Sequence, residues 1–284
     1  MSPWNLEYVL ELLNESAKIA LYYFDHPKRE FKKDRSIVTQ ADKEIEAMLA
    51  KEFDRPNKGS YLIGEETVES KDEAYLAVAL EGSTWIIDPI DGTSSYANKL
   101  PSWGISIAHA ESGRITDGAI YLPLVGKLIL TRGKEVYTSA WNRDCREGIP
   151  ELTPFSPRHP IPPFEGGVIA LDQDSTRRGH TLPGTVHASG SCIFALLHLF
   201  MGGYISYIAY SKLWDVASGV ALMDALGFLG RFENGEPFTT SLDSNNYELS
   251  PATGNKRWKT KGRVIFCGSE EALTYTLQGL KKNT

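Results

Sequence analysis

The amino-acid sequence predicts a mixed α+β and α/β fold with two lobes, and three observations support this prediction. Strand-like segments between residues 103 and 139 are separated by short turns that contain Gly or Pro, which indicates an antiparallel sheet. Residues 142–164 contain six of the chain's 15 prolines and show no periodicity. Beyond them, strand-like and helix-like segments alternate.

These observations divide the chain of 284 residues into three parts. We expect residues 1–141 to form an N-terminal α+β lobe around the antiparallel sheet. Residues 142–164 should connect the lobes, and residues 165–284 should form a C-terminal α/β lobe with a mixed sheet. With 42% hydrophobic residues, the chain can bury a large core as one domain or as two fused lobes.

The N-terminal lobe begins with two predicted helices. Apolar residues recur at helical spacing from Leu6 to Phe24 and again from Ala41 to Phe53. Residues 26–36 between them are charged and show no pattern, so we expect an exposed loop. Strands should follow at residues 61–63, 85–87, 103–110, 116–121, 127–131 and 135–139.

The C-terminal lobe should alternate strands and helices. Helices should begin at Ser191 and Trp214, and a last helix should follow Ser269. Ser269 can cap that helix. Glu270 and Glu271 also lie favourably near its positive end. Strands are expected at residues 168–171, 185–188, 204–210 and 263–267.

Composition limits the possible classes of function. No run approaches the ~18 apolar residues of a membrane span, and the N-terminus lacks a leader with a cleavage site. Cys145, Cys192 and Cys267 are far apart, which predicts neither a disulfide framework nor a zinc site. We therefore expect a soluble cytoplasmic protein without a membrane partner. The net charge of −6 argues against nucleic acid as a partner.

The segment from residue 85 to residue 93 is the most informative part of the chain. An apolar, strand-like run ends there in two carboxylates, Asp88 and Asp91, with Pro89 between them. Pro89 pushes Asp88 into an extended conformation, so a helix cannot form at this point. A turn that carries both acids is expected instead.

Such a turn can bind both a metal ion and a phosphate. Asp88, Asp91 and the carbonyl of Ile90 offer the oxygen ligands that Mg²⁺ prefers. Gly92 and Thr93 offer backbone N–H groups at the start of the next helix, where phosphates bind. The alternative is an acidic surface turn, because Asp, Pro and Gly are common turn residues.

Acidic residues also accompany two other apolar segments. Glu65 and Glu66 follow the predicted strand at residues 61–63, and Asp215 opens the helix that begins at Trp214. Each has a structural alternative. Glu65 and Glu66 begin an acidic stretch that solvent could cover, and Asp215 could be a helix cap.

Taken together and in order, these segments resemble the inositol monophosphatase family of metal-dependent phosphatases. The resemblance runs from about residue 6 to about residue 230. It implies a layered α-β-α-β-α sandwich and a lithium-sensitive phosphatase that forms a homodimer. The matching segments are Lys33 to Asp42, Gly64-Glu65-Glu66, Asp88-Pro89-Ile90-Asp91-Gly92-Thr93, Gly190-Ser191 and Trp214-Asp215.

By the same resemblance, two or three Mg²⁺ ions bind among these acids. Glu65, Asp88 and the carbonyl of Ile90 would hold one ion. Asp88 would share a second ion with Asp91 and Asp215, and Glu65 would help to hold a third. Physical reasoning agrees, because two carboxylates ~4 Å apart repel each other by ~4 kcal/mol at an effective dielectric constant of ~20. Four carboxylates would not gather without cations between them.

The resemblance also implies which residues act on the substrate, a small-molecule phosphate monoester. Asp42 and Thr93 would orient and deprotonate the attacking water, and Glu65 belongs to the same catalytic group. Asp42 could instead be only a helix-start residue, and Lys33 could close over the metal site. The residues that contact the substrate would be Asp91, Gly92, Thr93, Ser191 and Asp215.

The part of the chain that should recognise the leaving group departs from the family. Inositol phosphatases of this family usually have an Asp and a Glu in the strand before Trp-Asp. Residues 203–213 contain no acid here and add Lys212. We therefore expect inositol monophosphate to be hydrolysed with a kcat/KM at least ~10-fold below that of a substrate that is less hydroxylated or that carries negative charge near Lys212. The reason is that apolar side chains stand where acids are usual, at Ile205, Ile208 and Ala209.

The sequence alone thus predicts a Mg²⁺-dependent phosphomonoesterase similar to inositol-1-monophosphatase. Family members that act on histidinol phosphate, fructose 1,6-bisphosphate or 3′-phosphoadenosine phosphates remain alternatives, and Pro101-Ser102-Trp103-Gly104 resembles the histidinol-phosphate branch. A non-catalytic regulatory protein with the same fold is disfavoured, because the sequence retains every expected metal ligand.

Overall fold

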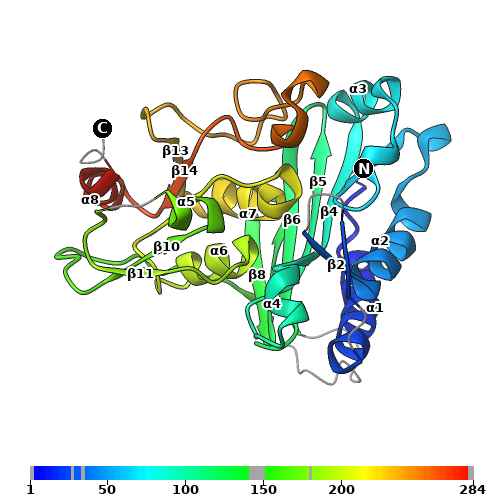
Figure 1. Ribbon diagram of the computed structural model, residues 1–284. Coiled ribbons are helices and arrows are strands. Elements are labelled where there is room, and N and C mark those ends of the chain that lie inside the picture. Colours follow the sequence, from blue (N-terminus) through cyan, green and yellow to red (C-terminus); the bar gives the residue numbers. More distant parts are fainter. Residues whose placement is uncertain (1–2, 27–28, 33–35, 141–150, 179–180, 281–284) are drawn as a thin grey trace.

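The computed structural model describes residues 3–26, 29–32, 36–140, 151–178 and 181–280. Helices and sheets alternate in five layers (Figure 1): two helices, a seven-stranded sheet, two further helices, a five-stranded sheet and a last helix. Each layer buries its apolar side chains against the next one. The α-β-α-β-α sandwich expected from the sequence is therefore confirmed.

The first helical layer consists of α1 (Leu6–Asp25) and α2 (Gln40–Phe53), each within one residue of its predicted range. Their apolar faces pack against one face of the large sheet. Between the helices, β1 (Arg29–Phe31) pairs with β2 (Ile37–Thr39) in a short antiparallel ribbon. The exposed loop expected over this stretch is thus partly a β-ribbon.

The large sheet has the strand order β3-β4-β5-β6-β7-β8-β9. β3 and β4 are parallel, because α3 crosses over between them. All other neighbouring pairs in this sheet are antiparallel, so the predicted antiparallel sheet is confirmed, whereas α3 and β9 were not predicted. The bounds are β3 (Ser60–Gly64), α3 (Glu73–Glu81), β4 (Ser83–Asp91), α4 (Thr93–Ala97), β5 (Gly104–Glu111), β6 (Arg114–Leu122), β7 (Lys127–Arg132), β8 (Glu135–Ala140) and β9 (Thr153–Pro154), with 3₁₀ turns η1 (Pro56–Lys58) and η2 (Val68–Ser70).

The small sheet has the order β11-β10-β12-β14-β13 and is mixed, as predicted. β10 is parallel to β11 and β12, while β14 is antiparallel to β12 and β13. The edge strand β13 and the short helix α5 were not predicted. The bounds are β10 (Val168–Leu171), α5 (Gln173–Arg177), β11 (Thr185–His187), α6 (Cys192–Phe200), β12 (Ser206–Ala209), α7 (Leu213–Leu226), β13 (Leu229–Phe232), η3 (Pro251–Lys256), β14 (Val264–Cys267) and α8 (Glu270–Leu280).

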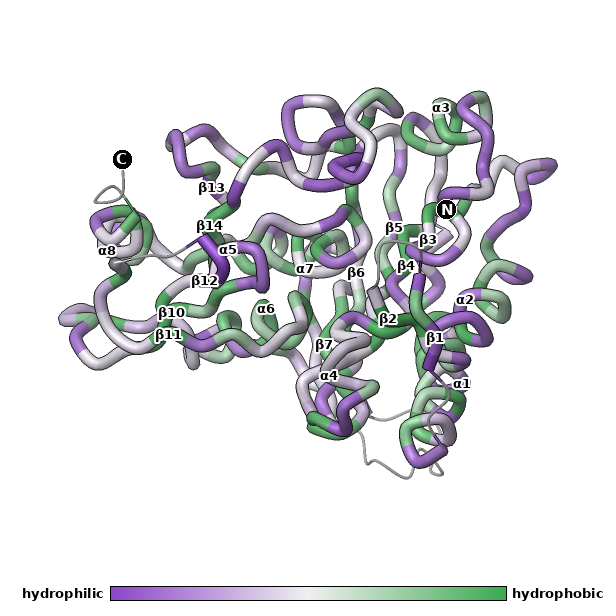
Figure 2. Tube along the Cα trace, viewed as in Figure 1, coloured by the Kyte–Doolittle hydropathy of each residue, from purple (hydrophilic) through white to green (hydrophobic). Residues whose placement is uncertain are grey.

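Helix α7 lies in the middle layer and is buried on nearly all sides. Gly118 of β6 allows it to rest directly on the large sheet, because a Cβ at residue 118 would stand 2.8 Å from the Cα of Ser218. The hydroxyls of Ser106 and Ser218 also share a hydrogen bond (2.7 Å). Figure 2 shows hydrophobic residues concentrated in the strands and the middle layer, with hydrophilic ones on the outer loops. The position of Asp215 in α7 is therefore tied to the large sheet.

Three other sequence expectations concern the whole chain. No helix among the described residues is long and apolar enough to span a membrane. Cys192 and Cys267 are buried free thiols, and Cys145 lies outside the described residues. The division into lobes at residues 142–164 stays a prediction, and β9, which lies in that segment, pairs with β8 of the large sheet.

The contact at Gly118 leads to a test of how α7 is held. We expect Gly118→Ala to destabilise the protein by about 1–3 kcal/mol, because the new methyl group must push α7 away from the sheet. Gly262→Ala is the matched control, since a Cβ there has its nearest heavy atom 3.8 Å away, in Phe232. Urea unfolding measures both variants. Equal stabilities for the two would contradict the proposed close packing.

Candidate functional site

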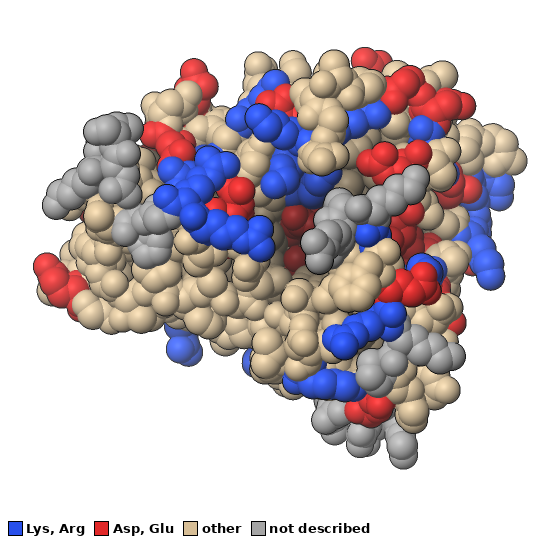
Figure 3. Space-filling view, viewed as in Figure 1, with Lys and Arg blue, Asp and Glu red and all other residues tan. Residues whose placement is uncertain are grey.

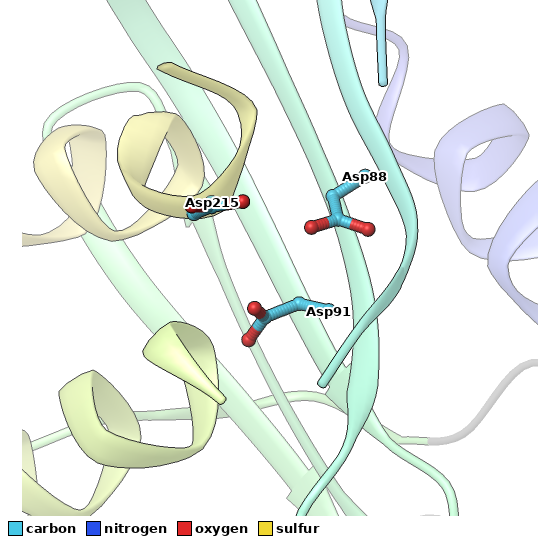
Figure 4. A group of neighbouring side chains, drawn as sticks. All are labelled: Asp88, Asp91 and Asp215. Carbon is cyan, nitrogen blue, oxygen red and sulfur yellow. The ribbon is translucent and has the colours of Figure 1, made fainter. Parts of the chain in front are cut away.

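Three carboxylates converge where the end of β4 meets the start of α7 (Figure 4). One oxygen from each of Asp88, Asp91 and Asp215 lies within 4.8 Å of the other two. Asp88 is 1% exposed and Asp91 is 5% exposed. The structure thus brings together three of the acids that the sequence singled out, from segments more than a hundred residues apart.

The end of β4 is an irregular strand rather than the expected turn. β4 continues to Asp91, and its pairing with β5 shifts register between Asp88 and Asp91. In a regular strand, residues three apart point to opposite faces, so this bulge is what allows both carboxylates to face one space. The N–H of Ile90 turns back to donate to Asp88 Oδ1 (3.1 Å).

Gly92 makes the sharp change of direction from β4 into α4. Its φ is +87°, a conformation that favours glycine. A Cβ at residue 92 would also stand 2.7 Å from the carbonyl oxygen of Ser102. Thr93 can therefore begin α4 directly beside the acids, at the helix start that the sequence predicted. That its N–H binds phosphate stays a prediction.

Asp91 and Asp215 are each oriented by the beginning of a helix. Asp91 Oδ2 accepts hydrogen bonds from the hydroxyl of Ser191 (2.5 Å) and from the N–H of Ile193 (2.8 Å), at the start of α6. Asp215 Oδ2 accepts one from the N–H of Lys212 (2.8 Å), the residue before α7. Asp215 is thus both a helix-start residue and a member of the cluster, and its role as a metal ligand stays a prediction.

The pKa values of these acids reflect burial and mutual repulsion. Burial raises the pKa of Asp88 well above its usual range, and repulsion by Glu65 and Asp91 raises it further. Burial and then repulsion by Asp91 do the same for the pKa of Asp215. Burial raises the pKa of Asp91 to about 6, although its hydrogen bond from Ser191 opposes this rise. Buried, mutually repelling carboxylates are a donor set that fits a hard divalent cation.

Glu65 lies outside this group of three but lines the same cavity, of about 350 Å³, with Asp88, Asp91 and Asp215. Lys32 pairs with Glu65 (2.9 Å) and Glu66 (2.7 Å). Burial alone would lower the pKa of Lys32, but the two glutamates together raise it. Sequence reasoning named Lys33 for this place, and Lys33 lies outside the described residues.

The predicted pair of Asp42 and Thr93 is also close together. The hydroxyl of Thr93 lies 3.4 Å from Asp42 Oδ1 and 2.9 Å from the carbonyl oxygen of Ile90. The other oxygen of Asp42 accepts bonds from the N–H (2.7 Å) and hydroxyl of Thr39. Burial raises the pKa of Asp42 to about 7, so this carboxyl can gain or lose a proton near neutral pH.

Sequence reasoning missed one buried acid beneath the Glu65 turn. Glu46 is 0% exposed, and its Oε2 accepts the N–H of Glu66 (2.9 Å). Gly64 leaves room for this carboxyl, because a Cβ at residue 64 would collide with it. Burial raises the pKa of Glu46 to about 7. Its spacing of four residues from Asp42, on the same helix, was the available signal.

A second cavity, of about 280 Å³, adjoins the acids. Asp91 and Asp215 line one side of it, and the segment expected to recognise the leaving group lines another through Tyr207 and residues 210–212. The expectation that Ile205, Ile208 and Ala209 stand where the leaving group is recognised needs correction. Strand alternation turns Ile208 toward the layer of α8, and the other two are buried in the core, so none of them lines this cavity.

Comparison with known proteins agrees with this geometry. The model of the inositol monophosphatase family matches residues 6–279. A histidinol-phosphatase of Chlorobaculum parvum is 26% identical over 277 residues, which cover 90% of this chain and 98% of that protein. An inositol-1-monophosphatase of Bacillus subtilis is 26% identical over 215 residues, covering 72% and 75%. The crystal structure of an IMPase/NADP phosphatase complexed with Mg²⁺ and phosphate superposes with a TM-score of 0.69 at 17% identity, covering 94% and 93%.

The raised pKa values predict how stability depends on pH when a chelator removes divalent ions. An acid with a raised pKa stabilises the folded chain at low pH, and this stability is lost as pH rises through the folded pKa, about 6 for Asp91 and about 7 for Asp42. We therefore expect the melting temperature in chelator to fall between about pH 4, the pKa of an unfolded Asp, and about pH 7. Burial lowers the pKa of His109, which acts in the opposite direction, but five acids with raised pKa values outweigh this one group: Asp42, Glu46, Asp88, Asp91 and Asp215.

Calorimetry across this pH range measures the effect. Asp91→Asn should flatten the profile, whereas Glu81→Gln, at an exposed residue outside both cavities, should leave it unchanged. A melting temperature that stays level or rises with pH would contradict the raised pKa values.

Proposed function

The chain belongs to the inositol monophosphatase family, and from this premise we propose that it is a Mg²⁺-dependent phosphomonoesterase acting on a small metabolite. The observation that carries the proposal is the buried group of Asp88, Asp91 and Asp215, whose oxygens lie within 4.8 Å of one another. Two carboxylates at this separation repel by about 3 kcal/mol at an effective dielectric constant of about 20. A fold retains such an arrangement when cations bind between the acids.

We propose the metal ligands that the family resemblance implies, and the cavity that these residues share supports this choice. Glu65, Asp88 and the Ile90 carbonyl would hold one Mg²⁺, and Asp88, Asp91 and Asp215 would hold a second, with Glu65 available to a third. When bound, Mg²⁺ supplies positive charge to the transferring phosphoryl group and lowers the pKa of water. Lys32 contacts Glu65 through one carboxylate oxygen, Oε1 (2.9 Å), so Oε2 could serve as the metal ligand. Li⁺ would compete at the position beside Asp91 and Asp215.

The chain's own residues position the water and the phosphate. The Thr93 hydroxyl has one proton, and its carbonyl acceptor at Ile90 is nearer than Asp42. With its hydroxyl turned instead toward Asp42 Oδ1 (3.4 Å), Thr93 can accept a hydrogen bond from water; as a water proton passes to the hydroxyl oxygen, the hydroxyl proton would pass to an ionised Asp42. The N–H groups of Gly92 and Thr93 would bind the phosphate, and Ser191 would contact it while holding Asp91.

A specific observation favours histidinol phosphate as one candidate substrate. The histidinol-phosphatase of Chlorobaculum parvum aligns over 90% of this chain, whereas the Bacillus subtilis inositol-1-monophosphatase aligns over 72%. Residues 101–104 resemble the same branch. Inositol monophosphate stays the reference substrate, and a panel of phosphate esters assayed for released phosphate distinguishes the candidates. Absence of hydrolysis across the whole panel would favour a regulatory protein with this fold.

The metal proposal is tested by substitution and by chelation. We expect phosphate release only with Mg²⁺ or a similar ion, and we expect Asp91→Asn or Asp215→Asn to abolish it while the protein stays folded. Asp224→Asn is the matched control, since Asp224 is exposed on the same helix as Asp215. Mg²⁺ should also raise the melting temperature of the unaltered chain, because a ligand that binds only the folded state stabilises it. Undiminished activity in chelator would refute the proposal.

The role of Asp42 and Thr93 is tested separately from metal binding. Thr93→Ala or Asp42→Asn should lower kcat by ~10²-fold or more, the range of lost general-base catalysis. Thr93→Ser keeps the hydroxyl and should keep most of the activity. Affinity for Mg²⁺, measured by calorimetric titration, should change little in all three variants. An unchanged kcat in Thr93→Ala and Asp42→Asn would place the base elsewhere.

A further inference from the structure

The cavity of about 280 Å³ beside the acids has a cationic outer wall. Arg177 at the end of α5 and Lys259 in the segment before β14 both line it. Tyr210 lines it as well, and Lys259 Nζ lies 4.3 Å from the centre of the Tyr210 ring. Figure 3 shows Lys and Arg side chains gathered beside a hollow with acidic side chains on its floor.

The acids of this outer wall already have partners. Asp172 Oδ1 accepts the N–H of Ser175 (2.7 Å), and its Oδ2 accepts the N–H of Tyr210 (2.6 Å). Asp174 forms an ion pair with Arg178 (2.7 Å). Among the described residues, neither carboxylate forms an ion pair with Arg177 or Lys259.

The two cations, by contrast, have no carboxylate partner among the described residues. No ion pair within the described ranges involves Arg177 or Lys259. Nearby cations differ in this respect, because Arg178 pairs with Asp174 and Lys261 pairs with Glu248 (3.0 Å). Lys212 also lines this cavity, but its Nζ donates to the carbonyl oxygen of Arg257 (2.7 Å), which leaves Arg177 and Lys259 as the lining cations without an ion pair or side-chain hydrogen bond among the described residues.

We propose that Arg177 and Lys259 form a binding subsite for a second anionic group, a phosphate or a carboxylate, on the leaving group of the substrate. The inference rests on the proposed phosphatase function, because it assigns the reacting phosphate to the acid cluster and the second anion to the opposite wall. Arg provides a planar set of donors suited to anionic oxygens, and Lys provides a compact point charge. Tyr210 offers its ring to the body of the leaving group.

This subsite narrows the substrate class. Inositol monophosphate has a neutral leaving group and would leave both cations without a partner. Histidinol carries positive charge, which the cationic wall repels, so this inference ranks histidinol phosphate, the candidate that alignment coverage favours, below substrates with a second anion. Once divalent cations neutralise the acids, a substrate with an anion at each end can bind through its reacting phosphate at the acid cluster and through its second anion at Arg177 and Lys259.

The experiment compares substrates that differ only in the second anion. One pair is fructose 1-phosphate and fructose 1,6-bisphosphate, and the other is phenyl phosphate and 4-carboxyphenyl phosphate. The unaltered enzyme with Mg²⁺ should prefer the second member of at least one pair by about 10-fold or more in kcat/KM, and the preferred pair identifies phosphate or carboxylate. Lys259→Ala and Arg177→Gln should each reduce that preference by about 10-fold.

Matched controls distinguish binding at this subsite from an effect of the protein's overall charge. Lys261→Ala and Arg132→Gln remove the same charges from residues that do not line the cavity, and should leave the preference unchanged. The proposal is overturned if the unaltered enzyme prefers neither second member. It is also overturned if Lys259→Ala and Arg177→Gln behave like the controls.

A binding measurement keeps the test independent of turnover. In chelator, where the acid cluster repels anions, fructose 6-phosphate should bind more tightly than fructose, and Lys259→Ala should weaken its binding by about 10-fold. Equal binding of the two sugars would refute the subsite. Failure of the proposed function has a different signature, since no ester of the panel, including phenyl phosphate, would then release phosphate with Mg²⁺.

Discussion

The structure depends on the forced proximity of like charges where β4 meets α7. Asp88, Asp91 and Asp215 are buried with oxygens within 4.8 Å of one another, and their mutual repulsion opposes folding. Each carboxylate accepts a hydrogen bond from a backbone N–H, of Ile90, Ile193 and Lys212 respectively. These bonds orient the carboxylates but do not neutralise them. The surrounding packing must hold the cluster together.

Three elements share that task, and each meets the cluster at its end. β4 contributes a bulge, α6 contributes its first N–H groups, and α7 contributes its first turn. Because α7 rests directly on β6 at Gly118, Asp215 cannot move without moving a buried helix. Rigid elements hold ligand atoms more accurately than loops do. The less rigidly held neighbour is Glu65, whose partner is the half-buried Lys32.

Local patterns allowed much of this architecture to be predicted. The helical spacing of apolar residues gave α1 and α2 within one residue, and Pro89 between two acids marked the cluster. What could not be predicted depends on contacts between distant residues. The register shift between Asp88 and Asp91 depends on pairing with β5. The direction of Ile208 depends on which layer covers each face of β12, so a sequence comparison placed an apolar residue at a site that it does not line. The pairing of Asp172 with Tyr210 is equally non-local.

The opposite charges on the two sides of the cleft constrain the order in which metal ions and substrate can bind. The acid floor repels any phosphate until cations occupy it, so in the proposed function Mg²⁺ must bind before the substrate. In the proposed subsite, Arg177 and Lys259 would attract an anion even then. Lys32, which pairs with both Glu65 and Glu66, would remain a further cation beside the floor. Metal binding would thus convert a cleft that repels phosphate at its floor into one that attracts it from both sides.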